Sequence, residues 1–144
     1  MSQEVKILII NGPNLNLLGT REPTIYGNLT FEDFLKEVKH DFSTVDISYF
    51  QSNIEGELIN TLHDADKQNL AGIVLNAGGY SHTSVALADA VNAISTPVVS
   101  VHISNIYTRE PERHRDLLSK YVLGGIFGLG IQGYRLAISA LAGR

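Results

Sequence analysis

Cysteine and tryptophan are absent from the 144 residues, and methionine occurs once. The lack of cysteine excludes disulfides, zinc–thiolate sites, iron–sulfur clusters and a thiol nucleophile. Basic residues are also in the minority, since 11 Lys and Arg against 15 Asp and Glu give a net charge of -4. General nucleic-acid binding needs a basic surface, so we expect no nucleic-acid partner.

Long apolar runs are missing as well. The longest nearly apolar stretch, residues 122–131, is interrupted by glycines and is shorter than the roughly 20 residues that a membrane span needs. The apolar run at residues 5–10 is too short for a signal peptide. Hydrophobic residues make up 44% of the chain and charged residues 18%, which is typical of a globular domain. We expect one cytoplasmic domain over residues 1–144, with no membrane partner.

The hydrophobic pattern alternates between strands and helices along the chain. Short runs rich in Val, Ile and Leu predict strands at residues 5–10, 45–50, 72–75, 98–103 and 126–127. Helical spacing and capping residues predict helices that follow Thr30, Asn53 and Ser81 or Thr83, a short charged helix at 113–119 and a closing helix at 134–141. This alternation predicts a flavodoxin-like α/β fold, a doubly wound five-stranded parallel sheet of order 2-1-3-4-5 with helices on both faces.

Polar residues follow three of these strands. In such sheets ligands bind at the carboxyl ends of the strands, near the switch between strands 1 and 3. The segments at these ends are 11–14, 76–79 and 102–105, and His82 and His102 belong to the same edge. No third ligand accompanies the two histidines at suitable spacing, so we expect substrate binding or acid–base catalysis rather than a metal site.

Two polar loops add charge near this edge. The loop at residues 11–28 contains Arg21 and Tyr26. Tyrosine is a weak base at neutral pH because its pKa is ordinarily near 10, but a nearby guanidinium favours the phenolate. The second loop, residues 107–120, contains Arg109, Arg113, Arg115 and Lys120. A basic loop beside a pocket suits an anionic ligand such as a small carboxylate.

Three classes of protein that bind a nucleotide or accept a phosphate fit the sequence poorly. Residues 128–133 match G-x-G-x-x-G, but too few residues follow for the rest of a dinucleotide fold, so close helix–strand packing is the better interpretation. A phosphoacceptor response regulator needs carboxylates where this chain has Asn11 and Asn76. An FMN-binding module would need a Ser/Thr-rich loop after the first strand, where only Thr20 and Thr24 occur.

Four groups of motifs resemble the type II 3-dehydroquinate dehydratases in order and spacing over nearly the whole chain. They are residues 11–23 with 25–27, 51–53 with 55–57, 76–87 with 89–90, and 101–105 with 109–111. The resemblance implies the flavodoxin-like fold and the dehydration of 3-dehydroquinate to 3-dehydroshikimate, in the shikimate pathway or in quinate catabolism. It further implies a reaction without cofactor or metal and a homo-dodecamer, a tetramer of trimers.

The resemblance also assigns roles to individual residues. It implies that Tyr26 is the base, that Arg21 keeps it ionised, that Asn14 holds a water at the enolate and that His102 is the general acid. A lid loop at about residues 14–28 would close over the substrate. The implied substrate-binding residues are Asn76, His82, the backbone amides of Ile103 and Ser104, Arg113, and Asp89, which would reach a neighbouring subunit.

The chain departs from the family pattern near the expected acid. Ser100 stands where the family usually has Glu, two residues before His102 and on the same side of a strand. In the second loop, Glu112, Arg115 and Asp116 replace the usual residues. These changes leave an alternative open, a carboxylate-binding paralogue with weak or no catalysis.

Overall fold

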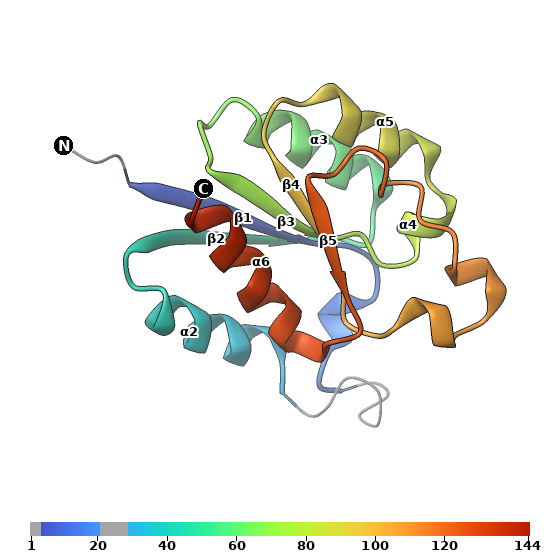
Figure 1. Ribbon diagram of the computed structural model, residues 1–144, viewed down its shortest axis with the longest axis horizontal. Coiled ribbons are helices and arrows are strands. Elements are labelled where there is room, and N and C mark those ends of the chain that lie inside the picture. Colours follow the sequence, from blue (N-terminus) through green and yellow to red (C-terminus); the bar gives the residue numbers. More distant parts are fainter. Residues whose placement is uncertain (1–3, 21–28) are drawn as a thin grey trace.

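One parallel sheet forms the centre of the computed structural model, which describes residues 4–20 and 29–144 (Figure 1). Within these residues five strands pair in parallel in the order β2-β1-β3-β4-β5. The strands are β1 (Val5–Asn11), β2 (Val45–Gln51), β3 (Gly72–Asn76), β4 (Val98–His102) and β5 (Gly124–Phe127). The predicted fold class and strand order are confirmed.

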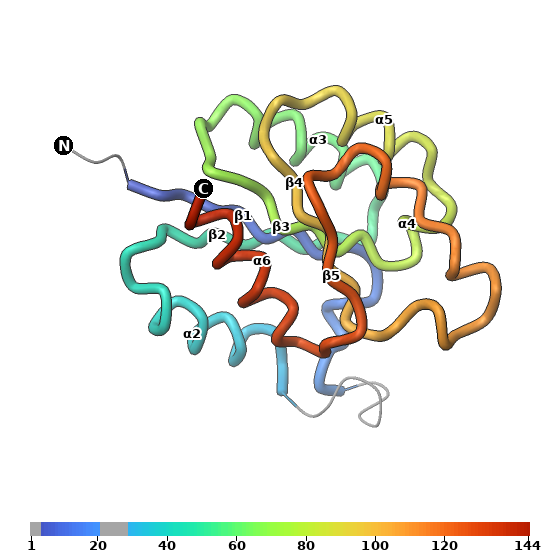
Figure 2. The backbone as a smooth tube through the Cα atoms, viewed as in Figure 1, coloured from blue at the N-terminus to red at the C-terminus, as the bar shows by residue number. Residues whose placement is uncertain are grey.

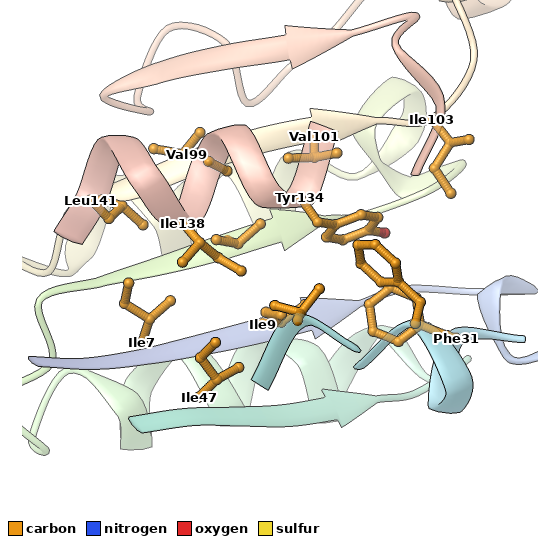
Figure 3. Close-up of a cluster of buried hydrophobic side chains, with 14 of the residues drawn as sticks. Ile7, Ile9, Phe31, Ile47, Val99, Val101, Ile103, Tyr134, Ile138 and Leu141 are labelled. Atoms are coloured by element: carbon orange, nitrogen blue, oxygen red, sulfur yellow. The ribbon is translucent and has the colours of Figure 1, made fainter. Parts of the chain in front are cut away.

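Helices cover both faces of the sheet (Figure 1). On one face lie α2 (Phe31–Asp41) and α6 (Gly133–Ala142), and on the other lie α3 (Glu55–Ala65) and α5 (Val85–Ala93). Each face of the sheet carries a hydrophobic core, the first under α2 and α6 and the second under α3 and α5. Strand β1 supplies Ile7 and Ile9 to the first core (Figure 3), and Leu8 and Ile10 to the second. Side chains of a strand point alternately to opposite faces, so a continuous apolar run feeds both cores. No helix in the described residues is long and apolar enough to span a bilayer.

The predicted helix ends are only partly right. The Thr30 side chain accepts a hydrogen bond from the Asp33 amide, as the capping pattern at α2 predicts. The prediction that Asn53 caps α3 is wrong, because Ile54 holds the cap position and the Asn53 side chain instead accepts from the Asn14 amide. This long-range contact outweighs the local capping preference of asparagine.

The predicted third helix is broken into two. A single turn, α4 (Tyr80–Thr83), precedes α5, and Ser84 between them is extended. The Ser84 hydroxyl accepts from the Leu87 amide at 2.9 Å and so caps α5, a role predicted for Ser81 or Thr83. The break lets α4 carry His82 separately from the longer helix.

The predicted short helix at 113–119 is absent. Short 3-10 turns occur at η2 (Ile106–Thr108) and η3 (Pro111–Arg113), and residues 114–120 then run without a helix beside α4 (Figure 2). The Leu117 amide donates to the Ser81 carbonyl at 2.8 Å, and Leu118 is buried in the second core. These tertiary contacts replace the hydrogen bonds that a helix would have made within the segment.

Glycine 133 explains the glycine pattern before the last helix. A Cβ atom at this position would lie 3.3 Å from Val101 Cγ1 and 3.4 Å from Ile126 Cγ2. Gly133 therefore lets the first turn of α6 pack closely on β4 and β5. This contact supports helix–strand packing over dinucleotide binding as the interpretation of residues 128–133.

Candidate active site

A cavity of about 230 Å³ lies at the carboxyl ends of the central strands. Asn14 follows β1, Asn76 ends β3 and His102 ends β4, and all three line the cavity. The carboxyl ends of adjacent parallel strands meet at one edge, so the sheet order brings these distant residues together. The cavity is at the edge that the sequence predicted.

Most of the predicted site residues line this cavity. They are Asn14, Asn76, His82, His102, Ile103, Ser104 and Arg113. Asp89 is exposed on α5 and is not among the lining residues, and its reach into a neighbouring subunit stays a prediction. Arg21, Tyr26 and part of the predicted lid lie outside the described residues. The sequence had placed Arg109 in a basic loop, and it too lines the cavity.

Close backbone packing joins two of the loops that contribute residues to the cavity. A Cβ atom on Gly12 would lie 2.5 Å from the Ala77 carbonyl oxygen, so only glycine permits the loops after β1 and β3 to touch. Asn14 has a left-handed backbone conformation, with φ of 70°, which asparagine tolerates better than most residues. Its amide donates to the Asn53 side chain at 2.9 Å. These contacts fix where Asn14 enters the cavity.

A buried hydrogen-bond network orients Asn76. Its side-chain nitrogen donates to the Tyr134 hydroxyl at 2.8 Å, and its side-chain oxygen accepts from the Gly78 amide at 3.1 Å. The Tyr134 hydroxyl donates in turn to the Asn11 side-chain oxygen at 2.7 Å. Burial raises the pKa of Tyr134 well above its ordinary value, although both asparagine hydrogen bonds act to lower it. Tyr134 is therefore a neutral donor, and no motif in the sequence indicates its role at the site.

The Tyr134→Phe variant is expected to lose about 1–3 kcal/mol of unfolding free energy, because one buried hydroxyl pairs two buried asparagines. Chemical denaturation measures this loss. The matched control is Tyr107→Phe, since Tyr107 is half-exposed and no side-chain hydrogen bond of its hydroxyl is found in the described residues. Equal stability of the two variants would contradict the role of the network.

The two histidines lie side by side in the cavity. Their ring centroids are 5.9 Å apart and the rings are inclined by 20°. His82 Nδ1 donates to the Arg115 carbonyl at 2.7 Å, because a carbonyl oxygen can only accept. This hydrogen bond fixes the tautomer and orientation of His82, and it leaves Nε2 for a ligand.

His102 has a carboxylate partner behind the cavity. Its Nε2 atom lies 2.9 Å from Asp116 Oδ2, and the two side chains are 9% and 7% exposed. Burial acts to raise the pKa of Asp116, but the hydrogen bonds from His102 and the Leu118 amide outweigh it and leave that pKa below its ordinary value. Asp116 is therefore an ionised acceptor at neutral pH. From the sequence alone, Asp116 is only a departure from the family pattern.

Cationic and amide donors surround the open side of the cavity. Arg109 Nη1 lies 3.5 Å from the Ser104 hydroxyl, and Arg113 pairs with Glu110. The backbone amides of Ile103 and Ser104 donate to no acceptor within residues 4–20 and 29–144. Such donors suit a small carboxylate ligand. Over the same part of the chain, no cluster of three or more His, Asp and Glu side chains could hold a metal ion.

Comparisons with known proteins find relatives in sequence and in structure over the whole chain. The family model described as "Dehydroquinase class II" matches residues 5–142. A 3-dehydroquinate dehydratase of Proteus mirabilis is 47% identical over 146 aligned residues, covering 100% of this chain and 99% of that protein. The crystal structure of a type II dehydroquinase from Propionibacterium acnes superposes with a TM-score of 0.93 at 38% identity, over 100% of both chains.

A second solved structure gives the same result. The type II dehydroquinase from Butyrivibrio crossotus superposes with a TM-score of 0.92 at 39% identity, covering 98% of this chain and 99% of that one. The family resemblance seen in the sequence motifs is thus confirmed over nearly the full length. The chain belongs to the class II dehydroquinase family of hydro-lyases.

Proposed function

We propose that this protein converts 3-dehydroquinate to 3-dehydroshikimate through an enolate. The observation that carries the proposal is the convergence of His82, His102, Asn14 and Asn76 on one cavity with cationic donors at its rim. Relatives that carry the name 3-dehydroquinate dehydratase match the chain over its full length. The residue roles below extend that family relationship to this chain.

The substrate is a small carboxylate with several hydroxyl groups, and the cavity offers partners for both. The backbone amides of Ile103 and Ser104, which donate to no acceptor among the described residues, are suited to the carboxylate, and Arg113 adds positive charge beside them. His82 and Asn76 line the same cavity, and in this proposal their side chains hydrogen-bond the hydroxyl groups. Fixed donors and acceptors of this kind orient a substrate and lower the entropic part of the barrier.

The elimination requires one base and one acid. Tyr26, as a phenolate favoured by Arg21, removes the proton from the carbon between the ketone and the C1 hydroxyl. The electron pair moves into an enolate, which hydrogen bonds from a water held by Asn14 stabilise. The enolate then reforms the ketone as the C1–oxygen bond breaks, and His102 protonates the departing hydroxyl so that it leaves as water.

The direct test is to mix the purified protein with 3-dehydroquinate and follow near-ultraviolet absorbance. The product contains a conjugated enone, whereas the substrate has an isolated ketone, so absorbance should rise with turnover. Calorimetric binding of 3-dehydroquinate without any rise in absorbance would instead identify a carboxylate-binding paralogue. A purified protein that is colourless, and whose thermal stability does not change when FMN is added, would exclude a flavin module.

The assembly and location are also proposals. We propose a homo-dodecamer in which Asp89 approaches the site of a neighbouring subunit, and a cytoplasmic location. Sedimentation velocity tests the proposed assembly. A mass of about twelve chains is expected, and a monomer would contradict the dodecamer.

A further inference from the structure

A carboxylate from outside the central strands holds the ring of His102. Asp116 Oδ2 accepts from His102 Nε2 at 2.9 Å, and both side chains are less than a tenth exposed. Ion pairs of exposed residues contribute little because water screens them, but this pair is shielded. The contact is therefore able to control which ring nitrogen carries a proton.

The segment around Asp116 is fixed in place. Asp116 Oδ1 accepts from the Leu118 amide at 2.9 Å, so both carboxylate oxygens are engaged. The Leu117 amide donates to the Ser81 carbonyl at 2.8 Å, and the Arg115 carbonyl accepts from His82 at 2.7 Å. Leu118 is 1% exposed. The carboxylate is thus held toward His102 by its neighbours on both sides in the sequence.

An ionised carboxylate dictates the protonation of the imidazole. Because it can only accept, Nε2 must carry a hydrogen, and Nδ1 is the ring nitrogen left for a ligand. No residue of the described segments hydrogen-bonds to Nδ1. A general acid at Nδ1 requires the doubly protonated ring, and a negative charge against Nε2 stabilises that form.

Other titratable and charged groups also lie near His102. His82 from α4, and Arg109 and Arg113 from the second loop, line the cavity with His102, and Tyr107 lines a second cavity behind it. Among the described residues that line either cavity, Asp116 is the only carboxylate.

We propose that Asp116 is the positioning residue that orients His102 and places a negative charge against its ring for its role as general acid. The inference rests on the proposed dehydratase activity. Ser100, on the same face of β4 two residues before His102, makes no hydrogen bond to the ring in the described part of the chain. Asp116 therefore supplies, from a loop, the negative charge that position 100 lacks.

The kinetic test uses Asp116→Asn, which keeps the shape of the side chain and removes its charge. We expect kcat to fall roughly 10- to 100-fold, since general acid catalysis accelerates a reaction about 10²- to 10⁴-fold. KM should stay within about threefold of the wild-type value. The alkaline limb of the kcat profile should move to lower pH. Asp46→Asn, which removes an exposed carboxylate from β2, is the matched control and should leave the profile unchanged.

Two rescue variants separate positioning from a structural role. Asp116→Glu should restore part of kcat, because it restores the charge. Ser100→Glu in the Asp116→Asn background should return the alkaline limb toward its original pH, since Ser100, His102 and Asp116 line one cavity of about 250 Å³ that can admit the longer side chain. An Asp116→Asn variant with reduced kcat but an unshifted pH profile would overturn the proposal and leave Asp116 a structural residue.

A measurement without substrate distinguishes this inference from the proposed function. Solid-state ¹⁵N spectra of histidine-labelled protein report the protonation of each ring nitrogen, and His102→Gln identifies the His102 signals. We expect the doubly protonated His102 ring to persist to higher pH in the wild type than in Asp116→Asn. Identical spectra would refute the role of Asp116, whereas a wild type with this difference but no turnover would refute the dehydratase activity alone.

Discussion

The Tyr26→Phe variant is expected to lose at least about a thousandfold in kcat while its fold is unchanged. The substitution removes one hydroxyl, and with it the proposed base. General base catalysis contributes about 10²–10⁴, and no other tyrosine of the cavity can replace it, because none of the described lining residues is a tyrosine. The enone absorbance assay measures the loss, and circular dichroism checks the fold.

Solvent exchange adds a sharper measurement for Tyr26. In deuterated water, the proton beside the ketone is replaced by deuterium only if a base removes it. The Tyr26→Phe variant should show neither enone formation nor protein-dependent deuterium incorporation. The matched control, Tyr121→Phe, alters a half-buried tyrosine outside the cavity and should react at the wild-type rate. A Tyr26→Phe variant of undiminished rate would refute the role given to this residue.

In the His102→Gln variant kcat is expected to fall about 10²- to 10³-fold, because the general acid is lost while the base is intact. Glutamine keeps a polar side chain in the cavity but cannot deliver a proton to the departing hydroxyl. Because the proposed base is intact, the variant should still exchange the proton beside the ketone, so deuterium should enter the substrate although little enone forms. This contrast with Tyr26→Phe separates the acid from the base within one experiment.

Two controls make the His102 result interpretable. His102→Gln leaves the buried Asp116 carboxylate with a weaker partner, so the variant should be about 1–3 kcal/mol less stable, which chemical denaturation measures. His40→Gln changes an exposed histidine of α2 and should alter neither rate nor stability. Loss of both turnover and deuterium exchange in a folded His102→Gln variant would contradict the separation of acid and base.

The side chains that line the cavity are held in place by residues outside it. Asn76 is held by Tyr134 on α6, while His82 and His102 are held by the segment 115–116. The orientation of these three side chains therefore depends on α6 and on the segment 115–116, which carry no reacting group. Substitutions at Tyr134 or Asp116 are expected to alter the chemistry at a distance through the groups they orient.

The sequence alone determined the sheet and the location of the site. Short runs rich in Val, Ile and Leu separated by helical patterns can bury their side chains only in a parallel sheet covered on both faces, as β1 does with Ile9 and Ile10. Because parallel strands end at one edge, Asn76 and His102 had to meet there. Several described residues of the family motifs, among them Asn14, Asn76 and His102, lie at that edge.

Only the tertiary structure decided the partners of these residues. His102 and Asp116 are 14 residues apart, and Tyr134 and Asn11 are 123 apart, so no local pattern links them. The predicted helix at 113–119 failed because Leu118 is buried and the Leu117 amide bonds to α4, and both contacts depend on the finished fold. Local propensity is worth a few tenths of a kcal/mol per residue, so a buried leucine or a shielded ion pair overrides it.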